Sequence, residues 1–194
     1  MSRRRFETKR WARWLGTFVG FPLAGVAARA VAGAIDTTEA AVLGGLAAGA
    51  VLGAVQVGIG GIEAERIRWI GATALGLSAG LAVGAGAVGY ETDTASLVTM
   101  GCVCGAGVGL AQAVSVSMGR VDRVLWVIVT PLLWAGGWLI TSQVIVDADR
   151  QHAMFGSSGA LAVSALSGVL YATRDRGDRP VAVPSGALTG EAVA

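Results

Sequence analysis

Apolar residues are grouped along the chain in six long blocks, and polar residues are concentrated in the short segments between them. Each block is close to the roughly 20 residues that a helix needs to cross a bilayer. None shows the period-two alternation of a membrane strand, and a bilayer admits only helices or closed barrels. The pattern predicts an all-α integral membrane protein with six transmembrane helices, at residues 14–35, 40–62, 69–90, 97–118, 124–145 and 155–172.

Composition agrees with this prediction. The chain of 194 residues is 54% hydrophobic and 14% charged, whereas a soluble domain carries about 25% charged residues. Arg29 is the only charged residue inside a block. We therefore expect a basic N-terminal segment at residues 1–13, a membrane domain at 14–172 and a disordered tail at 173–194.

Basic residues indicate the orientation of the helices. Thirteen of the fifteen Lys and Arg lie before the first block, between the second and third, between the fourth and fifth, or after the last. In a chain of six spans, these four segments lie on the same side of the membrane. The opposite loops hold mainly acidic residues: Asp36, Glu39, Glu91, Asp93, Asp147 and Asp149, with Arg150. Because basic loops stay inside, both termini are predicted to be cytoplasmic. Richness in Ala, Gly, Val and Arg, with a single Lys, suggests a GC-rich bacterial genome. The predicted location is therefore a bacterial cytoplasmic membrane.

The first residues, SRRRF at 2–6, also fit a twin-arginine export signal. The apolar block that follows is longer than the roughly 7–15 residues of a signal core. A retained first helix is therefore favoured.

A ladder of glycines occurs twice, as GLAAGAVLGAVQ and GCVCGAGVGLAQ. In each copy a glycine stands at every fourth position and a glutamine follows the last by three. The residues are Gly45, Gly49, Gly53 and Gln56, then Gly101, Gly105, Gly109 and Gln112. The last block carries a weaker version in Ala160, Ser164, Gly168 and Tyr171.

The helices that precede these ladders also resemble one another. Trp14, Trp69 and Trp126 each open a block after a basic segment, and a pair of small residues follows ten and eleven positions later. The chain thus predicts three parallel-repeat hairpins, near residues 14–62, 69–118 and 126–172. Parallel repeats are related by an axis along the membrane normal, so a pseudo-threefold bundle is expected, with a linear row of hairpins as the alternative.

Glycines at every fourth position lie on one helix face and allow a second backbone to approach. We therefore expect the ladders to pack within the bundle, like a glycine zipper. Gly71, Ala79 and Gly80 would form the complementary surface, and Gly137 is a further helix-packing residue. The alternative is that a ladder faces a partner protein, a lipid or a pore.

Gln56 and Gln112 lie inside apolar blocks, where an unpaired amide costs several kcal/mol. We expect each to donate or accept a hydrogen bond at the backbone of a neighbouring helix. The alternative is a polar constriction on the pseudo-axis, with Tyr171 as its third member.

Two further intramembrane positions are candidate sites. Arg29 could extend outward toward Asp36 or Glu39, or face the bundle and bind an anion, a headgroup or a partner carboxylate. Trp134 lies too deep for the interfacial aromatic belt. It is expected to face lipid or to contact a partner.

Candidate residues for chemistry are few. Cys102 and Cys104 diverge by about 200° on a helix and are expected to be packing residues. GSSG at 156–159 looks like the GxSG motif of rhomboid proteases, but no histidine follows it to act as a base. We predict no catalytic residue, cofactor or metal, and basic tails that bind anionic lipid rather than nucleic acid.

As a whole, the chain resembles a loose group of uncharacterised small bacterial membrane proteins built from glycine-ladder hairpins that end in Gln. The resemblance rests on residues 45–56 and 101–112 with their Trp-led partner helices, and it departs at Tyr171. The group implies no activity.

The function predicted from these features is that of a non-enzymatic accessory or scaffold protein. It would pack against a larger membrane complex, or against itself, through small-residue helix faces. Two alternatives remain: a small channel or carrier lined by Gln56 and Gln112, and a lipid-binding membrane protein.

Overall fold

The computed structural model of this protein describes residues 3–62, 65–144 and 157–173, and every element in that part of the chain is a helix. The elements are α1 (Arg3–Leu15), the 3-10 helix η1 (Gly16–Val19), α2 (Gly20–Ala32), α3 (Thr38–Gly58), α4 (Arg66–Ala87), α5 (Thr94–Ser115), α6 (Arg120–Val144) and α7 (Ser157–Thr173). Five helical stretches are long and apolar enough to cross a membrane, and α7 is a shorter apolar helix. By these lengths and compositions the chain is a helical multi-pass membrane protein. The predicted outer loop with Asp147, Asp149 and Arg150 and the tail after Thr173 lie outside the described residues.

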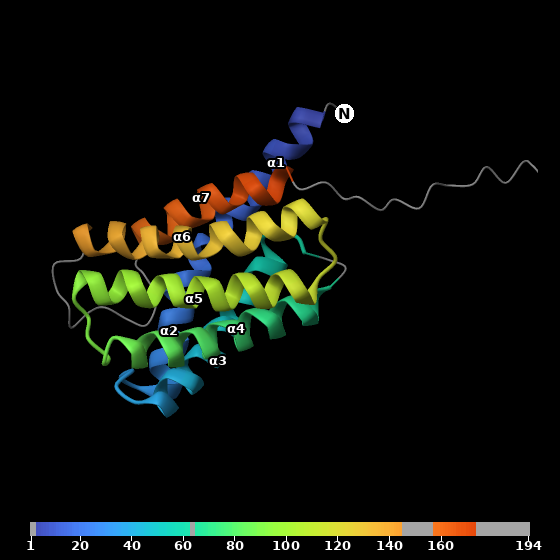
Figure 1. Ribbon diagram of the computed structural model, residues 1–194. Coiled ribbons are helices and arrows are strands. Elements are labelled where there is room, and N and C mark those ends of the chain that lie inside the picture. The colour runs from blue at the N-terminus through green and yellow to red at the C-terminus, as the bar shows by residue number, and fades with distance from the viewer. Residues whose placement is uncertain (1–2, 63–64, 145–156, 174–194) are drawn as a thin grey trace, which may run out of the picture.

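The helices lie side by side in one bundle (Figure 1). Each of α3, α4, α5 and α6 packs against the next one along the chain, and α7 packs against both α6 and α1. The first and last helices are therefore neighbours, so the alternative of a linear row of hairpins is wrong. The N-terminus and the end of α7 lie at the same end of the bundle.

The first membrane helix consists of α1, η1 and α2 in direct succession. Pro22 lies in the first turn of α2. It has no backbone N–H to donate to the carbonyl four residues earlier. That carbonyl belongs to Phe18, within η1, so the break in the α-helical hydrogen bonding at Pro22 coincides with the 3-10 segment. The predicted basic segment 1–13 is accordingly largely helical, because α1 begins at Arg3.

Short polar caps begin two of the helices. The Thr37 hydroxyl accepts a hydrogen bond from the Ala40 N–H, 3.2 Å away, at the start of α3. The Asp93 carboxylate accepts from the N–H groups of Ala95 and Ser96 at the start of α5. The Ser96 hydroxyl also donates to Asp93, and these bonds hold the pKa of the Asp93 carboxyl below its ordinary value. Such caps satisfy N–H groups that the helix itself leaves unpaired.

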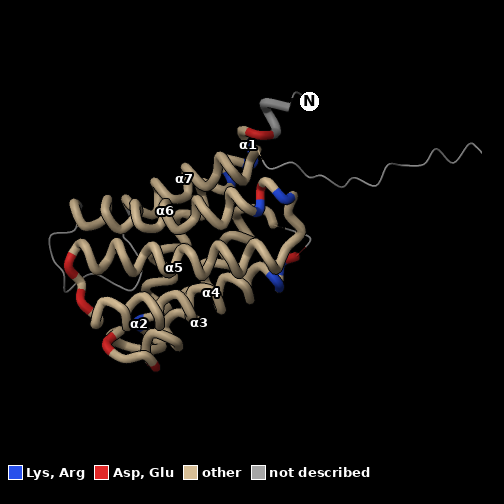
Figure 2. Tube along the Cα trace, in the orientation of Figure 1, with Lys and Arg blue, Asp and Glu red and all other residues tan. Residues whose placement is uncertain are grey.

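Charged residues gather at the two ends of the bundle, where one sign dominates each end (Figure 2). The minority charges include Glu65 and Asp122 beside the starts of α4 and α6, and Arg29 at the end of α2. Basic residues gather at the end where α4 and α6 begin and α7 ends, and include Arg66, Arg68, Arg120 and Arg123. The opposite end carries Asp36, Glu39, Glu91 and Asp93 beside the starts of α3 and α5. The two ends are called the basic end and the acidic end below.

Two arginines of α1 bind the C-terminal ends of other helices. Arg10 donates to the carbonyl oxygens of Tyr171 (2.7 Å) and Ala172 (3.2 Å) at the end of α7. Arg13 donates to the carbonyl of Ile59, at the end of α3 (3.1 Å). Cations are favourable at a helix C-terminus, where carbonyls lack intrahelical partners. The basic N-terminal segment thus stabilises the bundle in addition to any contact with lipid.

Replacing Arg10 by alanine is expected to loosen the last turn of α7. Hydrogen bonds to a charged group contribute about 1.5–3 kcal/mol, so amide hydrogen exchange over residues 165–173 should accelerate roughly tenfold or more. Arg13→Ala is the matched control, because it should accelerate exchange around Ile59 and leave α7 unchanged. Equal protection of α7 in both variants would contradict this role of Arg10.

Candidate functional site

Gln56 and Gln112 converge inside the bundle near its basic end. Gln56 lies in the last turn of α3 and Gln112 in the last turn of α5, and their side chains are 7% and 1% exposed. The Gln112 Nε2 lies 3.4 Å from the Gln56 Oε1 and donates to it. The matched ends of the two glycine ladders therefore meet.

Indole N–H groups are the main partners of the two glutamines. The Trp69 Nε1 donates to the Gln56 Oε1 at 2.8 Å, and the Trp126 Nε1 donates to the Gln112 Oε1 at 3.0 Å. Gln112 also donates to the Thr73 hydroxyl at 2.8 Å. The prediction of backbone partners is wrong, because the partners are side chains: each amide oxygen accepts from a tryptophan of the helix that follows its own, and the Gln112 amide donates to side chains of the two preceding helices. Trp69, Gln56, Thr73, Gln112 and Trp126 are called the Trp–Gln network below.

Three tryptophans meet around these amides. The ring centroids of Trp14, Trp69 and Trp126 are separated by 5.9–6.1 Å in every pairing, two of them edge to face. All three side chains are buried. Aromatic pairs in this range of distances stabilise a core beyond their buried area. The bundle is therefore filled at its basic end by indole rings.

Tyr171 occupies the glutamine position of the third ladder but binds differently. Its ring stacks on Trp14 with a centroid distance of 4.2 Å, and the Arg10 guanidinium lies 4.9 Å from its centroid. The Trp14 Nε1 donates instead to the Ser167 hydroxyl, one turn earlier on α7, at 2.9 Å. Each of the three indoles thus has an acceptor on an adjacent helix, and only the acceptor residue differs.

Threonines one turn after each tryptophan complete this arrangement. The hydroxyls of Thr17, Thr73 and Thr130 donate to the carbonyl oxygens of Trp14, Trp69 and Trp126 at 2.6–2.7 Å. These bonds satisfy the hydroxyl protons within their own helices. The lone pairs of the hydroxyls remain available to other donors, as Thr73 illustrates by accepting from Gln112.

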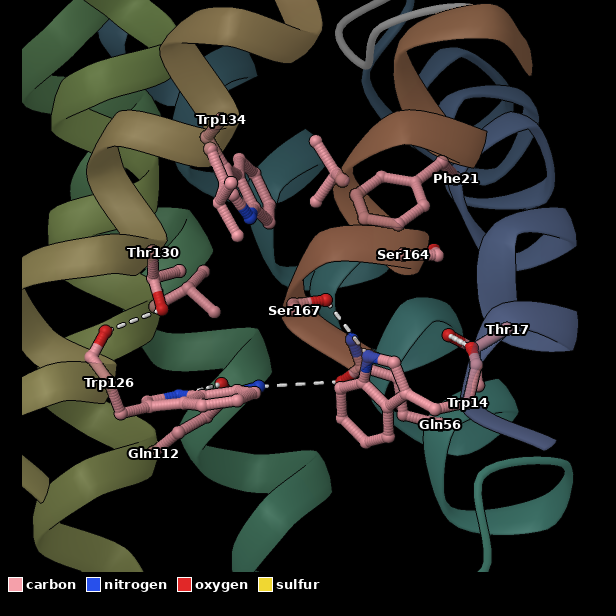
Figure 3. Close-up of a pocket in the computed structure, with 13 residues that line it drawn as sticks. Trp14, Thr17, Phe21, Gln56, Gln112, Trp126, Thr130, Trp134, Ser164 and Ser167 are labelled. Atoms are coloured by element: carbon pink, nitrogen blue, oxygen red, sulfur yellow. Dashed lines mark hydrogen bonds between the residues drawn. The ribbon is translucent and has the colours of Figure 1, made fainter. Parts of the chain in front are cut away.

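A small, partly open cavity lies next to the tryptophans (Figure 3). The space open to the centre of a water molecule is about 20 Å³. Its wall includes both glutamines. Toward the acidic end the wall is formed by Phe21 and Trp134, whose rings pack edge to face with their centroids 5.7 Å apart. Aromatic side chains therefore bound the cavity along the bundle in both directions.

The first ladder packs on α4. A Cβ on Gly45, Gly49 or Gly53 would lie 2.5–2.9 Å from the Cα of Ser78, Ala74 or Ile70 respectively. Real Cβ atoms do not approach a backbone so closely, so only glycine fits at these positions. The complementary surface consists of Ile70, Ala74 and Ser78 rather than Gly71 and Ala79, and Gly71 has nothing within 4 Å of a Cβ.

The second ladder packs on α6 in the same manner. A Cβ on Gly105 would lie 2.7 Å from the Pro131 Cα, and one on Gly109 would lie 3.0 Å from the Thr130 Cβ. Gly101 makes room for the indole of Trp138. Gly168 of α7 faces Trp11 and Trp14 at 3.1 Å, so the third ladder meets α1.

Gly80 and Gly137 lie in other interfaces. A Cβ on Gly80 would lie 2.7 Å from the Cα of Cys104, so Gly80 faces α5 rather than the first ladder. Gly137 is buried, and a Cβ on Gly159 of α7 would collide with the Gly137 carbonyl oxygen. Both glycines therefore allow close helix packing, but neither is the counterpart of a ladder glycine.

The structure shows that Arg29 points away from the bundle and that Trp134 points into it. Arg29 is exposed in the last turn of α2, so the alternative in which it faces the bundle is wrong. Trp134 and Trp138 are 4% and 2% exposed inside the bundle, so neither faces lipid. Cys102 and Cys104 are both free, and Cys104 is buried.

The tryptophan donors and Ser167 were not predicted as site residues. The sequence marks Trp14, Trp69 and Trp126 as equivalent, and a threonine follows each within four residues. An indole N–H inside a membrane needs an acceptor. The matched depth of Gln56 and Gln112 could have indicated that these glutamines accept from the tryptophans. Ser167 carries no such signal.

Comparison with known proteins supplies no relative. The chain matches no family model, no curated protein and no solved structure. Among the described residues, His, Cys, Asp and Glu form no cluster suited to a metal ion.

Proposed function

We propose that this protein is a non-enzymatic accessory or scaffold subunit that packs against another membrane protein in a bacterial cytoplasmic membrane. The ladder glycines are used inside the bundle, so a partner would bind elsewhere. The observation that carries the proposal is the set of small residues left open on the outward faces. Gly71 of α4 and Gly136 of α6 have nothing within 4 Å of a Cβ, and exposed large apolar side chains such as Leu75 and Leu132 flank them.

Small residues on a lipid-facing helix allow a second helix to approach closely, and such packing drives association in membranes. The proposed architecture is six spans in three parallel-repeat hairpins around a pseudo-threefold axis, with both termini in the cytoplasm. The repeated indole-to-acceptor bonds and the meeting of each ladder with a Trp-led helix support the repeat. The separation of basic and acidic ends supports the orientation.

Purification in mild detergent at native abundance, followed by mass spectrometry, tests this function. We expect a stoichiometric membrane partner, and loss of that partner in Gly136→Leu without loss of folded protein. Gly58→Leu, at the end of α3, is the control because a Cβ there also has nothing within 4 Å. A clean monomer or homo-oligomer from wild type would refute the proposal.

A second candidate function is transport of a small solute past Gln56 and Gln112. The cavity beside these amides favours it, because a carrier needs a polar site between two closures. Flux into liposomes that contain the pure protein, lost in the double variant Gln56→Leu with Gln112→Leu, would support transport. A third candidate, lipid binding, rests on Arg29, an exposed cation near the acidic end that would pair with a headgroup phosphate.

A further inference from the structure

The cavity beside the Trp–Gln network contains an unpaired polar group. Ser164 of α7 lines the cavity and is 1% exposed. Its Oγ has no hydrogen-bond partner among the residues that the structure describes. A buried hydroxyl without a partner costs about 1–3 kcal/mol, and such groups in folded proteins are commonly satisfied by ordered water.

Other groups in the cavity wall have hydrogen-bonding capacity left over. Ser167 accepts from Trp14 through its Oγ, which leaves its own proton to donate. Both hydrogen bonds that Gln56 makes to described residues are accepted by its Oε1, which leaves its amide NH2 group. Thr17 and Thr130 donate to carbonyls of their own helices and retain lone pairs. The wall therefore offers both donors and acceptors.

The size and charge of the cavity restrict what it can bind. A bound water needs roughly 10–15 Å³ of space open to its centre, together with two to four polar partners. The cavity has about 20 Å³ of such space, and its lining residues include no charged side chain. It suits a neutral molecule of the size of water.

We propose that this cavity is a binding site for an ordered water, held by the Ser164 hydroxyl of α7 and by polar groups of the helices that face it. The water joins α7, where the third ladder lacks its glutamine, to the Trp–Gln network formed by the other two. It adds a bridged contact to the direct hydrogen bond that Trp14 already donates to Ser167 of α7. This inference does not depend on the proposed function.

The substitution Ser164→Ala tests the proposal through the sign of its effect on stability. If water binds, alanine removes one of its partners, and the melting temperature in detergent should fall by about 2–4 °C, the shift expected for roughly 1 kcal/mol in a chain of this size. If the cavity is dry, alanine removes an unsatisfied hydroxyl and the melting temperature should stay constant or rise. Ser158→Ala, on the same helix and outside the cavity lining, controls for the change from serine to alanine.

A structure determined at a resolution that shows waters provides the second measurement. We expect density within about 3 Å of the Ser164 Oγ in wild type, and its loss or weakening in Ser164→Ala. A dry cavity in wild type, or a variant at least as stable as wild type, would overturn the proposal.

Discussion

Gly49→Ala is expected to lower the free energy of unfolding by about 2–3 kcal/mol, since overpacking a filled interface costs roughly 1–3 kcal/mol. The added Cβ would lie 2.5 Å from both the Ala74 Cα and the Thr73 carbonyl oxygen. Both atoms belong to the backbone of α4, so no side-chain rotation can relieve the contact. The helices α3 and α4 would have to separate along the whole ladder. Unfolding in mixed micelles, followed by tryptophan fluorescence, measures the change.

Gly71→Ala is the matched control on the neighbouring helix. A Cβ there has nothing within 4 Å, and alanine is favoured over glycine inside a helix by up to about 1 kcal/mol. We expect a neutral or slightly stabilising effect. If both substitutions changed stability by the same amount, the first ladder would not be a close-packed interface.

Gln112→Leu is expected to destabilise the bundle by about 2 kcal/mol, because a buried donor left without its partner costs roughly 1–3 kcal/mol. Leucine approximates the volume of glutamine but accepts no hydrogen bond from Trp126 and donates none to Thr73. Gln56→Leu should cost less, since Gln56 takes part in two side-chain bonds and Gln112 in three. Chemical unfolding of the two variants under the same conditions gives the ranking.

A double-mutant cycle separates this hydrogen bond from packing. Gln112→Leu leaves the Trp126 indole N–H without an acceptor. Trp126→Phe removes that N–H, so the double variant has no unpaired indole donor. We expect the two effects to be less than additive, with a coupling energy of about 1 kcal/mol. Full additivity would mean that the bond between Trp126 and Gln112 does not stabilise the fold.

The fold could be predicted from local patterns because a membrane imposes them directly. Apolar blocks of spanning length become helices wherever backbone groups cannot bond to water. Thus α3 and α5 lie within the ranges drawn from the sequence, apart from their first residues, which form the capped turns at Thr38 and Thr94. The extension of α1 to Arg3 was missed, since a basic polar segment offers no apolar period to detect.

The candidate site was predicted in part. The equivalence of Gln56 with Gln112 followed from their shared position after a ladder, and the structure brings the two amides into contact. Their indole partners could not be derived, because the chain order does not reveal which helix lies within reach of a given amide. The replacement of the third glutamine by Tyr171 was visible, but its stacking on Trp14 and the use of Ser167 were not.

The sequence by itself determined the class of protein, the helices, the charge of each end and the residues that share a helix face. These properties follow from composition and from the 3.6-residue period, which relate residues within one helix. Only the tertiary structure decided what each face meets: the first ladder meets Ala74 rather than Gly71, Arg29 points outward, and Trp134 points inward. The physical reason is that the rotation of a helix about its axis depends on contacts with all its neighbours at once. The repeated pattern of GLAAGAVLGAVQ and GCVCGAGVGLAQ therefore indicated a face for packing, and the bundle determined its partner.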